Sequence, residues 1–388
     1  MRLLTIIICI AVPMLMRGDE LSRLLETVEK NNLELKAMRE EIKASGYDIQ
    51  EQNRLDNTSV EYSPFFRRGA DGIASSELIV TQEFDFPTLY AARSKAGKSQ
   101  MSYIGRQYDV AGRDLMLTVA ENYLSLVRIN RVRRSLGDQL MDAEKLLKLS
   151  EKKMENGMIT SVELNRVKLQ IMDLKRSLLD NESEAIAVKS ELNRLNGYEE
   201  LDCAALDYPG WGVDAGEDVD LDATVVAAAS GVEAAKREES VAKQSWVPKL
   251  TLGYRRNTEL EEASNGFVVG ASFPLFTTSA KVKASKARRA AAEVNMENAR
   301  LQVASEFETA RQELQIIKRS MQEYNTALID DTQRLLMKSV ELGQMTLTDY
   351  YTELISLNET KMSYIDLEYE YYRRLCILYR NRLSTTIN

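Results

Sequence analysis

The side chains that could carry chemistry in this 388-residue sequence are mostly carboxylates. The chain has no histidine, which removes His-based triads and most zinc sites. Its three cysteines, Cys9, Cys203 and Cys376, are far apart and have no metal-ligand spacing. No Gly-rich phosphate loop and no pairing of nucleophile and base is visible. We therefore expect no enzyme, no cofactor and no dedicated metal site.

Three of the carboxylates, Glu163, Asp349 and Glu353, follow two similar glycine turns. The first turn centres on Gly157 and the second on Gly343, an offset of 186 residues. Phe-Pro recurs at nearly the same offset, at 86–87 and 273–274, so the chain contains an internal duplication. In each turn, glycine supplies a left-handed helix end and a Thr follows that can cap the next helix. The simplest role for a carboxylate there is a favourable interaction with the helix dipole.

The elements around these turns read as long helices and short hairpins. Residues 1–17 resemble a secretory signal peptide, with an apolar run too short to span a membrane. The first repeat, 18–197, reads as a helix over 19–55, a hairpin at about 58–86, a long helix, the tip at 157 and a last helix. An acidic linker, 198–222, follows; it is most simply solvated, with calcium binding as an alternative. The second repeat, 223–388, has a helix over 223–246, a hairpin at about 248–276, one helix over 279–342, the tip at 343 and a last helix.

The helix after the first tip has an apolar spacing of about 3.5 residues, which is typical of a coiled coil. Nine of its ten core positions are apolar, and Asn181 is the exception. The positions are Leu164, Val167, Ile171, Leu174, Leu178, Asn181, Ala185, Val188, Leu192 and Leu195. The net charge of −8 argues against a nucleic-acid partner.

Four strands in one chain leave two open sheet edges, which self-association would close. Two copies would give eight strands and three would give twelve, and both numbers suit a membrane barrel. A soluble β-subdomain is the alternative for either hairpin alone. The predicted fold class is mainly α with a small membrane β-barrel.

The mature chain resembles the TolC-like outer-membrane factors, or outer membrane efflux proteins. The resemblance rests on the two glycine tips with Thr160 and Thr346 behind them, and on three segments. These segments are Asn-Asn-Leu-Glu-Leu-Lys-Ala at 31–37, Pro-Lys-Leu-Thr-Leu-Gly-Tyr at 248–254 and Val-Gly-Ala-Ser-Phe-Pro-Leu-Phe at 269–276.

The resemblance implies a homotrimer in outer-membrane lipid, with a 12-stranded barrel continuous with a 12-helix periplasmic tunnel. It implies an exit duct of a tripartite efflux pump or type I secretion system that conducts substrates passively. A periplasmic adaptor protein, linked to an inner-membrane pump, would dock at the tips. The tip residues are Asn156, Gly157, Met158, Gly343, Gln344 and Met345.

The family closes its inner end with acidic residues after the second tip. Asp349 matches the first of them, while Thr352 stands where a second aspartate often occurs, beside Glu353. The resemblance thus implies a pore constriction at Asp349 and Glu353, with Glu163 as the repeat-one equivalent of Asp349. The alternative function is a periplasmic coiled-coil structural or adaptor protein of an envelope transport complex.

Overall fold

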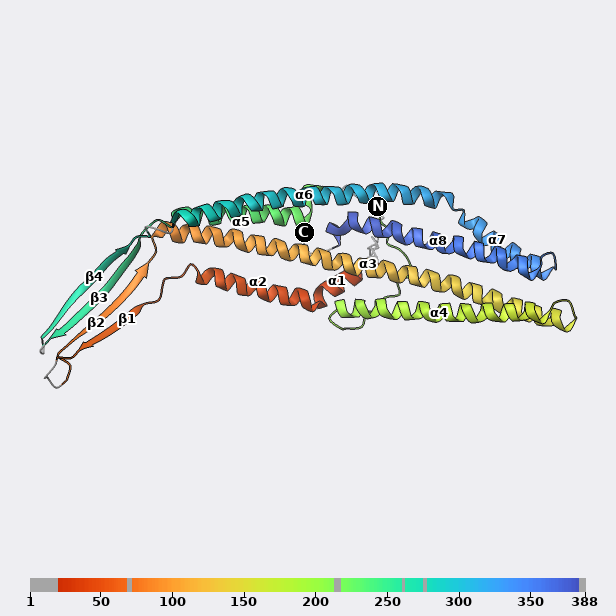
Figure 1. Cartoon of the computed structure of the whole chain (residues 1–388), viewed down its shortest axis with the longest axis horizontal. Coiled ribbons are helices and arrows are strands. Elements are labelled where there is room, and N and C mark those ends of the chain that lie inside the picture. The colour runs from red at the N-terminus through yellow and green to blue at the C-terminus, as the bar shows by residue number, and fades with distance from the viewer. Residues whose placement is uncertain (1–19, 68–71, 213–217, 260–261, 275–277, 384–388) are drawn as a thin grey trace, which may run out of the picture. The chain divides into compact units, whose positions relative to one another are not determined.

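The computed structural model describes residues 20–67, 72–212, 218–259, 262–274 and 278–383, so the expected signal peptide lies outside it (Figure 1). Within these residues the chain forms eight α-helices, two short 3₁₀ helices and four strands. The coarse fold prediction, mainly helical with a small sheet, is confirmed. No helix among the described residues is long and apolar enough to cross a membrane.

The chain divides into two compact units that do not coincide with the two sequence repeats. Among the described residues, the first unit comprises 20–32, 116–212 and 313–383; the second comprises 33–67, 72–115, 218–259, 262–274 and 278–312. Each unit takes segments from both repeats, because α3 (Pro87–Glu155) and α6 (Thr278–Glu323) each contribute residues to both units.

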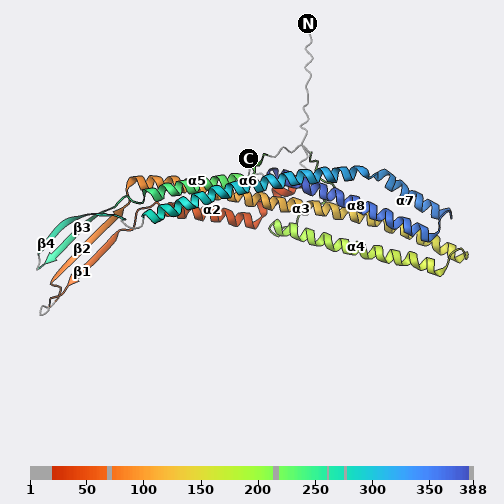
Figure 2. The ribbon, with the colours of Figure 1, turned by 45° about the horizontal axis from the view of Figure 1, so that its top comes forward.

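The first unit is a helical bundle. It contains α1 (Glu20–Asn31), the later part of α3, α4 (Ser161–Leu195), α7 (Thr326–Glu341) and α8 (Leu347–Tyr379). In both views α7 and α8 run side by side (Figures 1 and 2). The 3₁₀ turn η2 (Arg380–Arg382) ends the unit.

The buried face of α4 follows the expected heptad, including its one polar member. Seven of the ten positions are fully buried: Leu164, Val167, Ile171, Leu174, Asn181, Leu192 and Leu195. Asn181 donates from its amide to the Ile129 carbonyl of α3 at 3.2 Å. A buried polar residue bonded in one register favours that register over a shifted one.

Aromatic stacking holds the linker after α4 against α8 within the first unit. The rings of Tyr208 and Tyr372 lie 4.4 Å apart, and those of Trp211 and Tyr379 lie 5.1 Å apart. The Tyr379 hydroxyl also donates to the Gly212 carbonyl at 2.8 Å. This part of the expected acidic linker is therefore packed, while residues 213–217 lie outside the described residues.

The second unit holds the sheet. It contains α2 (Leu33–Glu51), β1 (Ser59–Phe65), β2 (Ser75–Phe84), η1 (Val219–Leu221), α5 (Ala223–Gln244), β3 (Lys249–Glu259) and β4 (Glu262–Ser272), with the first part of α3 and most of α6. All neighbouring strands are antiparallel, in the order β1-β2-β3-β4 (Figure 1). No described strand covers the outer edge of β1 or of β4.

Two helix predictions were wrong. The single helix over 19–55 is broken at Asn32, whose buried amide donates to the Leu195 carbonyl at 2.8 Å. The single helix over 279–342 is broken between Glu323 and Thr326. Asn325 begins α7 there because its side chain accepts from the Leu328 amide at 3.0 Å. The Asn325 side chain takes over backbone bonding that a continuous helix would otherwise make, whereas the Asn32 side chain binds the last carbonyl of α4.

Candidate functional site: the tips, the sheet and two polar clusters

The two tips have the same backbone geometry. Gly157 has φ +69° and Gly343 has φ +71°, so the predicted left-handed conformations are confirmed. The Met158 amide donates to the Lys153 carbonyl and the Gln344 amide to the Ser339 carbonyl, each at 2.8 Å. This six-to-one bond is the Schellman end of a helix. Asn156, Met158 and Gln344 are exposed and Met345 is half-buried.

Glu163 belongs to a capping box at the first tip. Its carboxylate accepts from the Thr160 amide at 2.8 Å, and the Glu163 amide donates to the Thr160 hydroxyl at 3.3 Å. The hydrogen bonds from Thr160 lower the pKa of Glu163 because they favour its charged form. The helix-start role expected of this carboxylate is thus present in the structure.

Asp349 has the matching position at the second tip. The Thr346 hydroxyl donates to its carboxylate at 2.7 Å and accepts from the Asp349 amide at 3.1 Å. Asp349 is exposed, as is Glu353 one turn later on α8. The Thr346 hydroxyl engages one carboxylate oxygen, Oδ2, so a helix-start role does not occupy the whole group.

The two tips are joined beneath their turns. The Lys153 ammonium, near the end of α3, donates to the Val340 carbonyl near the end of α7 at 2.8 Å. Below this bond, buried residues of all four helices form one apolar cluster that includes Tyr350 and Tyr351. The Arg166 guanidinium lies over the Tyr351 ring at 5.4 Å. Burial raises the pKa of Tyr351 to about 12, so this ring stays neutral at physiological pH.

A second apolar stripe on these helices faces away from the cluster. Its members are strongly exposed and recur mostly at seven-residue spacing. On α4 they are Val162, Leu169, Met172, Leu179 and Ile186; on α7 they are Leu328 and Leu335, with Leu342 directly after its last residue. This spacing is the pattern of a coiled-coil seam without its partner. The spacing was visible in the sequence, but which face the chain covers itself was not.

The sheet has one apolar and one polar face. Cross-strand pairs such as Val80 with Tyr254 and Leu252 with Val269 place the apolar side chains together. The apolar face consists of Val60, Tyr62, Leu78, Val80, Phe84, Leu250, Leu252, Tyr254, Phe267, Val269 and Ala271. The other face is mainly polar: it carries Glu61, Glu77, Thr81, Glu83, Lys249, Thr251 and Arg255, together with the apolar residues Phe65, Ile79 and Val268. Within it, Arg255 forms an ion pair with Glu77.

Gln82, the polar interruption of the apolar face, serves the connection into β1. Its amide donates to the Asp56 carbonyl at 2.5 Å, and the Thr58 hydroxyl donates to its oxygen at 2.6 Å. The residue therefore belongs to the helix end of the sheet, where polar groups can reach water.

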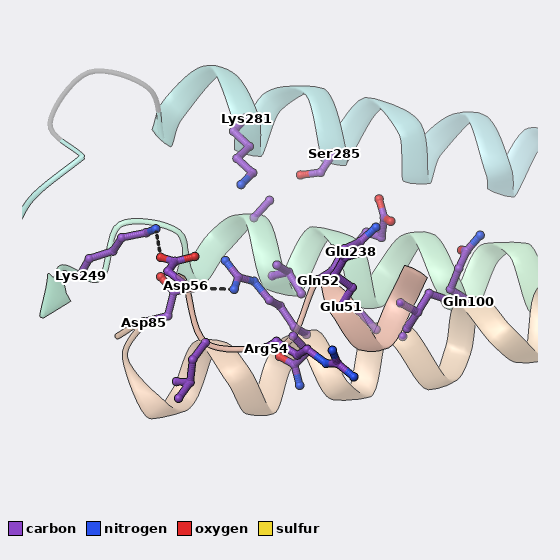
Figure 3. A pocket seen from close by; sticks show the side chains of 18 of the residues that line it. Glu51, Gln52, Arg54, Asp56, Asp85, Gln100, Glu238, Lys249, Lys281 and Ser285 are labelled. Atoms are coloured by element: carbon purple, nitrogen blue, oxygen red, sulfur yellow. Dashed lines mark hydrogen bonds and ion pairs between the residues drawn. The ribbon is translucent and has the colours of Figure 1, made fainter. Parts of the chain in front are cut away.

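A polar cavity of about 710 Å³ lies in the second unit where helices meet the sheet (Figure 3). Asp85 is bonded to Arg93 at 2.5 Å, and Asp56 to Lys249 at 2.7 Å. The other charged lining residues are Glu51, Arg54, Glu238, Lys281 and Arg288. The lining contains five cationic side chains and four carboxylates. Because these charges nearly balance, the cavity has no strong electrostatic preference for an anionic ligand.

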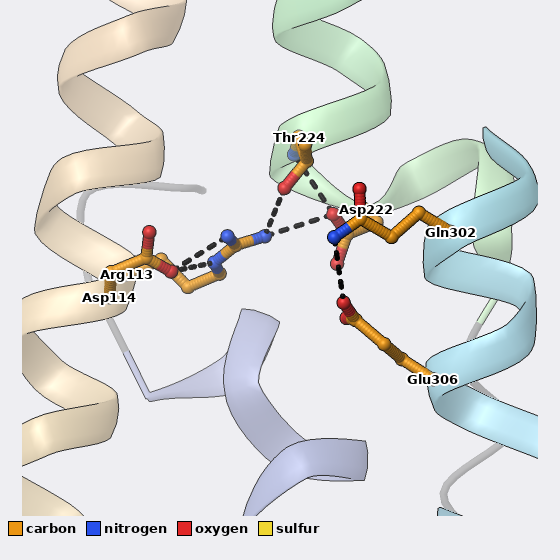
Figure 4. Close-up of polar contacts among 6 residues, drawn as sticks. All are labelled: Arg113, Asp114, Asp222, Thr224, Gln302 and Glu306. Atoms are coloured by element: carbon orange, nitrogen blue, oxygen red, sulfur yellow. Dashed lines mark hydrogen bonds and ion pairs between the residues drawn. The ribbon is translucent and has the colours of Figure 1, made fainter. Parts of the chain in front are cut away.

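A second polar cluster is buried where α5 begins (Figure 4). The Asp222 carboxylate accepts from Arg113 at 2.9 Å and, as the cap of α5, from the Thr224 amide at 2.9 Å. Arg113 also donates to the Thr224 hydroxyl and to Asp114. Arg113 and Asp222 are 5% and 0% exposed in their side chains. Through the Arg113–Asp222 ion pair, this cluster holds the end of the linker against α3. No sequence pattern predicted the cluster.

The cysteines take no part in these sites. Cys203 and Cys376 are both free thiols, and Cys376 is buried. Burial raises the pKa of both, with Cys203 reaching about 11. No group of three or more metal-ligating side chains is found among the described residues.

Residues 220–380 match the family model described as outer membrane efflux protein. Several solved structures are similar over nearly the whole chain. CusC is 15% identical, with 93% of this chain and 91% of that chain covered and a TM-score of 0.78. VceC from Vibrio cholerae is 17% identical, with 93% and 95% covered and a TM-score of 0.75. The CmeC outer membrane channel of Campylobacter jejuni is 14% identical, with 94% and 85% covered and a TM-score of 0.75. At these identities the likeness establishes the fold. No curated protein matches the sequence.

Proposed function

We propose that the chain is a TolC-like outer-membrane factor and forms the exit duct of an efflux system; the match of residues 220–380 to the family model and the likeness of the fold support this. The duct belongs to a tripartite efflux pump or a type I secretion system of the outer membrane. It conducts substrates passively from the periplasm and the inner-membrane pump to the exterior.

The observation that carries the proposal is the sheet. Its one apolar face is strongly exposed, with Phe267 and Val269 largely open to solvent, and both of its outer edges are unpaired among the described strands. An open sheet edge cannot persist in hydrocarbon, because each unsatisfied backbone group costs several kcal/mol. Three copies joined β1 to β4 would make a closed barrel of twelve strands, with apolar side chains outside and charged ones inside.

The exposed stripes on α4 and α7 support the same assembly in the helical part. In a homotrimer they would pack against helices of neighbouring copies, and the helices would line a common periplasmic tunnel. Burying side chains such as Leu169, Met172 and Leu335 would contribute about 1.5–3 kcal/mol each. A free coiled-coil rod would leave these stripes and the apolar sheet face in water.

The tips are the proposed contact for the periplasmic adaptor. Asn156, Gly157 and Met158, with Gly343, Gln344 and Met345, present two similar turns that the Lys153–Val340 bond holds together. Met158 is 70% exposed, and methionine suits an adaptable docking surface. An adaptor that binds both turns would meet a paired surface rather than two separate loops.

Asp349, with Glu353 and Glu163, is proposed to form the constriction of the duct. In a trimer one exposed carboxylate per chain becomes a ring of three, which attracts cations and repels anions. The Thr346 hydroxyl orients Asp349, since it donates to the Asp349 carboxylate and accepts from the Asp349 backbone amide at the helix start. Glu163 is the weaker member, because its Oε2 accepts from both the amide and the hydroxyl of Thr160, whereas Oδ2 of Asp349 accepts from the Thr346 hydroxyl.

The duct is tested first by location and assembly. The protein should sediment with outer membranes and run as a trimer in mild detergent. Recovery as a soluble monomer from the periplasm would favour the alternative, a coiled-coil structural or adaptor protein.

The constriction is tested by single-channel recording in planar bilayers. Asp349→Asn keeps the shape and the Thr346 bond but removes the charge, so cation selectivity and block by multivalent cations should weaken. Asp349→Ala should additionally raise conductance. Glu359→Gln, an exposed carboxylate on another face of α8, is the matched control. Unchanged selectivity, block and conductance in both Asp349 variants would leave Asp349 with a helix-capping role alone.

A further inference from the structure

One arginine lies on the apolar face of the sheet. Arg256 on β3 pairs with Leu78 of β2 and with Asn265 of β4, so its side chain belongs to the same face as Tyr254 and Phe267. We propose that Arg256, together with Asn265, binds the phosphate group of an anionic lipid at the outer border of the membrane. The inference rests on the proposed function, because that function places this face in lipid.

The position of Arg256 along the strand supports this assignment. β3 runs from Lys249 at the helix end of the sheet to Glu259 at the hairpin end. Arg256 is six residues beyond Leu250, the first apolar residue of the strand, or about 20 Å along it. At the tilt of about 35–45° that barrel strands adopt, this is about 15 Å of height within an apolar band about 25 Å tall. The long arginine side chain can extend several ångströms further toward the headgroups, and Thr258 follows Arg256 on the same face, so the guanidinium can reach the outer border of the band.

Within the described strands, Arg256 has no carboxylate on its own face of the sheet. No described residue forms an ion pair with its guanidinium. The carboxylates of the described strands, Glu61, Glu77, Glu83, Glu259 and Glu262, all belong to the opposite face. The adjacent Arg255 is on that opposite face and is paired with Glu77. Of the two consecutive arginines, Arg255 therefore has a described ion-pair partner and Arg256 does not.

The neighbours of Arg256 provide the other parts of a phosphate site. The Tyr254 hydroxyl donates to the Asn265 side-chain oxygen at 2.6 Å. This bond orients the Asn265 amide and leaves its NH₂ group as a donor beside the guanidinium. Arginine binds phosphate through two parallel hydrogen bonds, and an amide NH₂ can add a third. Tyr62 and Tyr254 are exposed on the same face, and tyrosines are enriched at membrane–water interfaces.

The test compares lipid selectivity in vesicles of phosphatidylcholine that contain a trace of spin-labelled lipid. The protein should associate with spin-labelled phosphatidylglycerol about fivefold more strongly than with spin-labelled phosphatidylcholine, as expected for one arginine at a membrane surface. Arg256→Gln should abolish this preference, and Arg256→Lys should restore part of it. Asn265→Asp, which leaves the arginine in place but adds a negative charge, should also abolish it.

Arg255→Gln is the matched control, since it removes the neighbouring charge from the polar face. Retention of the preference in Arg256→Gln, or its equal loss in Arg255→Gln, would overturn the lipid site. If inorganic phosphate displaced the labelled lipid at constant ionic strength, the site would bind free anions rather than lipid. Co-sedimentation with the vesicles is measured separately. Failure of the wild-type chain to insert would overturn the proposed function itself, whereas insertion without selectivity would overturn only the lipid site.

Discussion

Replacing Asp222 should destabilise the second unit more than any change to an exposed ion pair. Its carboxylate is fully buried and makes two stabilising interactions: it neutralises Arg113 and it caps the first turn of α5. Asp222→Ala leaves the Arg113 guanidinium buried beside Thr224, with Asp114 as its remaining charged partner among the described residues. The Asp114 side chain is 57% exposed, so solvent weakens its compensation.

The size of the effect follows from these contacts. Removing one partner of a buried ion pair costs about 3–5 kcal/mol. Loss of an N-cap costs about 1 kcal/mol, but the same carboxylate provides both interactions, so the two losses do not simply add. We expect Asp222→Ala to lower the local unfolding free energy by about 3–5 kcal/mol. Asp222→Asn keeps a capping oxygen and should cost less.

Asp220 supplies the control two residues earlier. It pairs with Arg300 at 2.9 Å, but both side chains are more than half exposed. Asp220→Ala should therefore cost less than about 1 kcal/mol. Replacing both buried partners, as in Arg113→Met with Asp222→Leu, should recover much of the loss because no uncompensated charge remains.

Amide hydrogen exchange over α5 measures this prediction directly, because it reports the free energy of local opening. Protection of the α5 amides should fall by two orders of magnitude or more in Asp222→Ala and change little in Asp220→Ala. Equal protection in the two variants would refute the reasoning, since it would mean that Arg113 finds a full replacement for Asp222.

Three further predictions concern the first unit. Gly157→Val and Gly343→Val should strain each turn by about 1 kcal/mol or more; an added Cβ meets no atom within 4 Å, so the cost is backbone strain alone. Efflux should be lost with the trimer intact, because the proposed adaptor docks at these turns. Gly137→Val, in a helix with equal space, should retain efflux. Cys203 should react with iodoacetamide at pH 8 about 100-fold more slowly than a thiol of pKa 9, since its pKa is about 11; equal rates in native and unfolded protein would contradict this. The capping box lowers the pKa of Glu163, so its contribution to stability is present above the pKa of the unfolded chain and is lost as pH falls through the pKa of the folded protein. Hydrogen exchange at the start of α4 should therefore accelerate as pH falls through that range. Glu163→Gln should remove this pH dependence.

Local patterns predicted much of the fold because they concern neighbours in the sequence. Glycine with positive φ at 157 and 343 follows from turn chemistry, and the buried face of α4 follows from its spacing. Asn181 interrupts the apolar pattern, yet it is buried because the Ile129 carbonyl is available to it. That carbonyl belongs to a helix 52 residues away, so the sequence alone could not show the bond.

The features that sequence reasoning missed depend on contacts between distant segments. The helix break at Asn32 is stabilised by the Leu195 carbonyl, 163 residues away, and Arg113 meets Asp222 across 109 residues. Neither pair has a sequence pattern of its own, because a single Asn, Arg or Asp looks the same whether it is buried and paired or lies on a solvated helix face. The roles of Asp349 and of the tips stay predictions, since their partners would be other chains.

The unpaired edges of β1 and β4 also determine the order in which such a protein could be assembled. A single copy has a seven-residue edge and an eleven-residue edge that lipid cannot solvate. For the proposed trimer, membrane entry would then accompany or follow association, and its rate should rise steeply with the concentration of chains. A chain with one blocked edge could join two normal copies but not close the ring, so each defective copy would withhold two normal copies from a complete barrel.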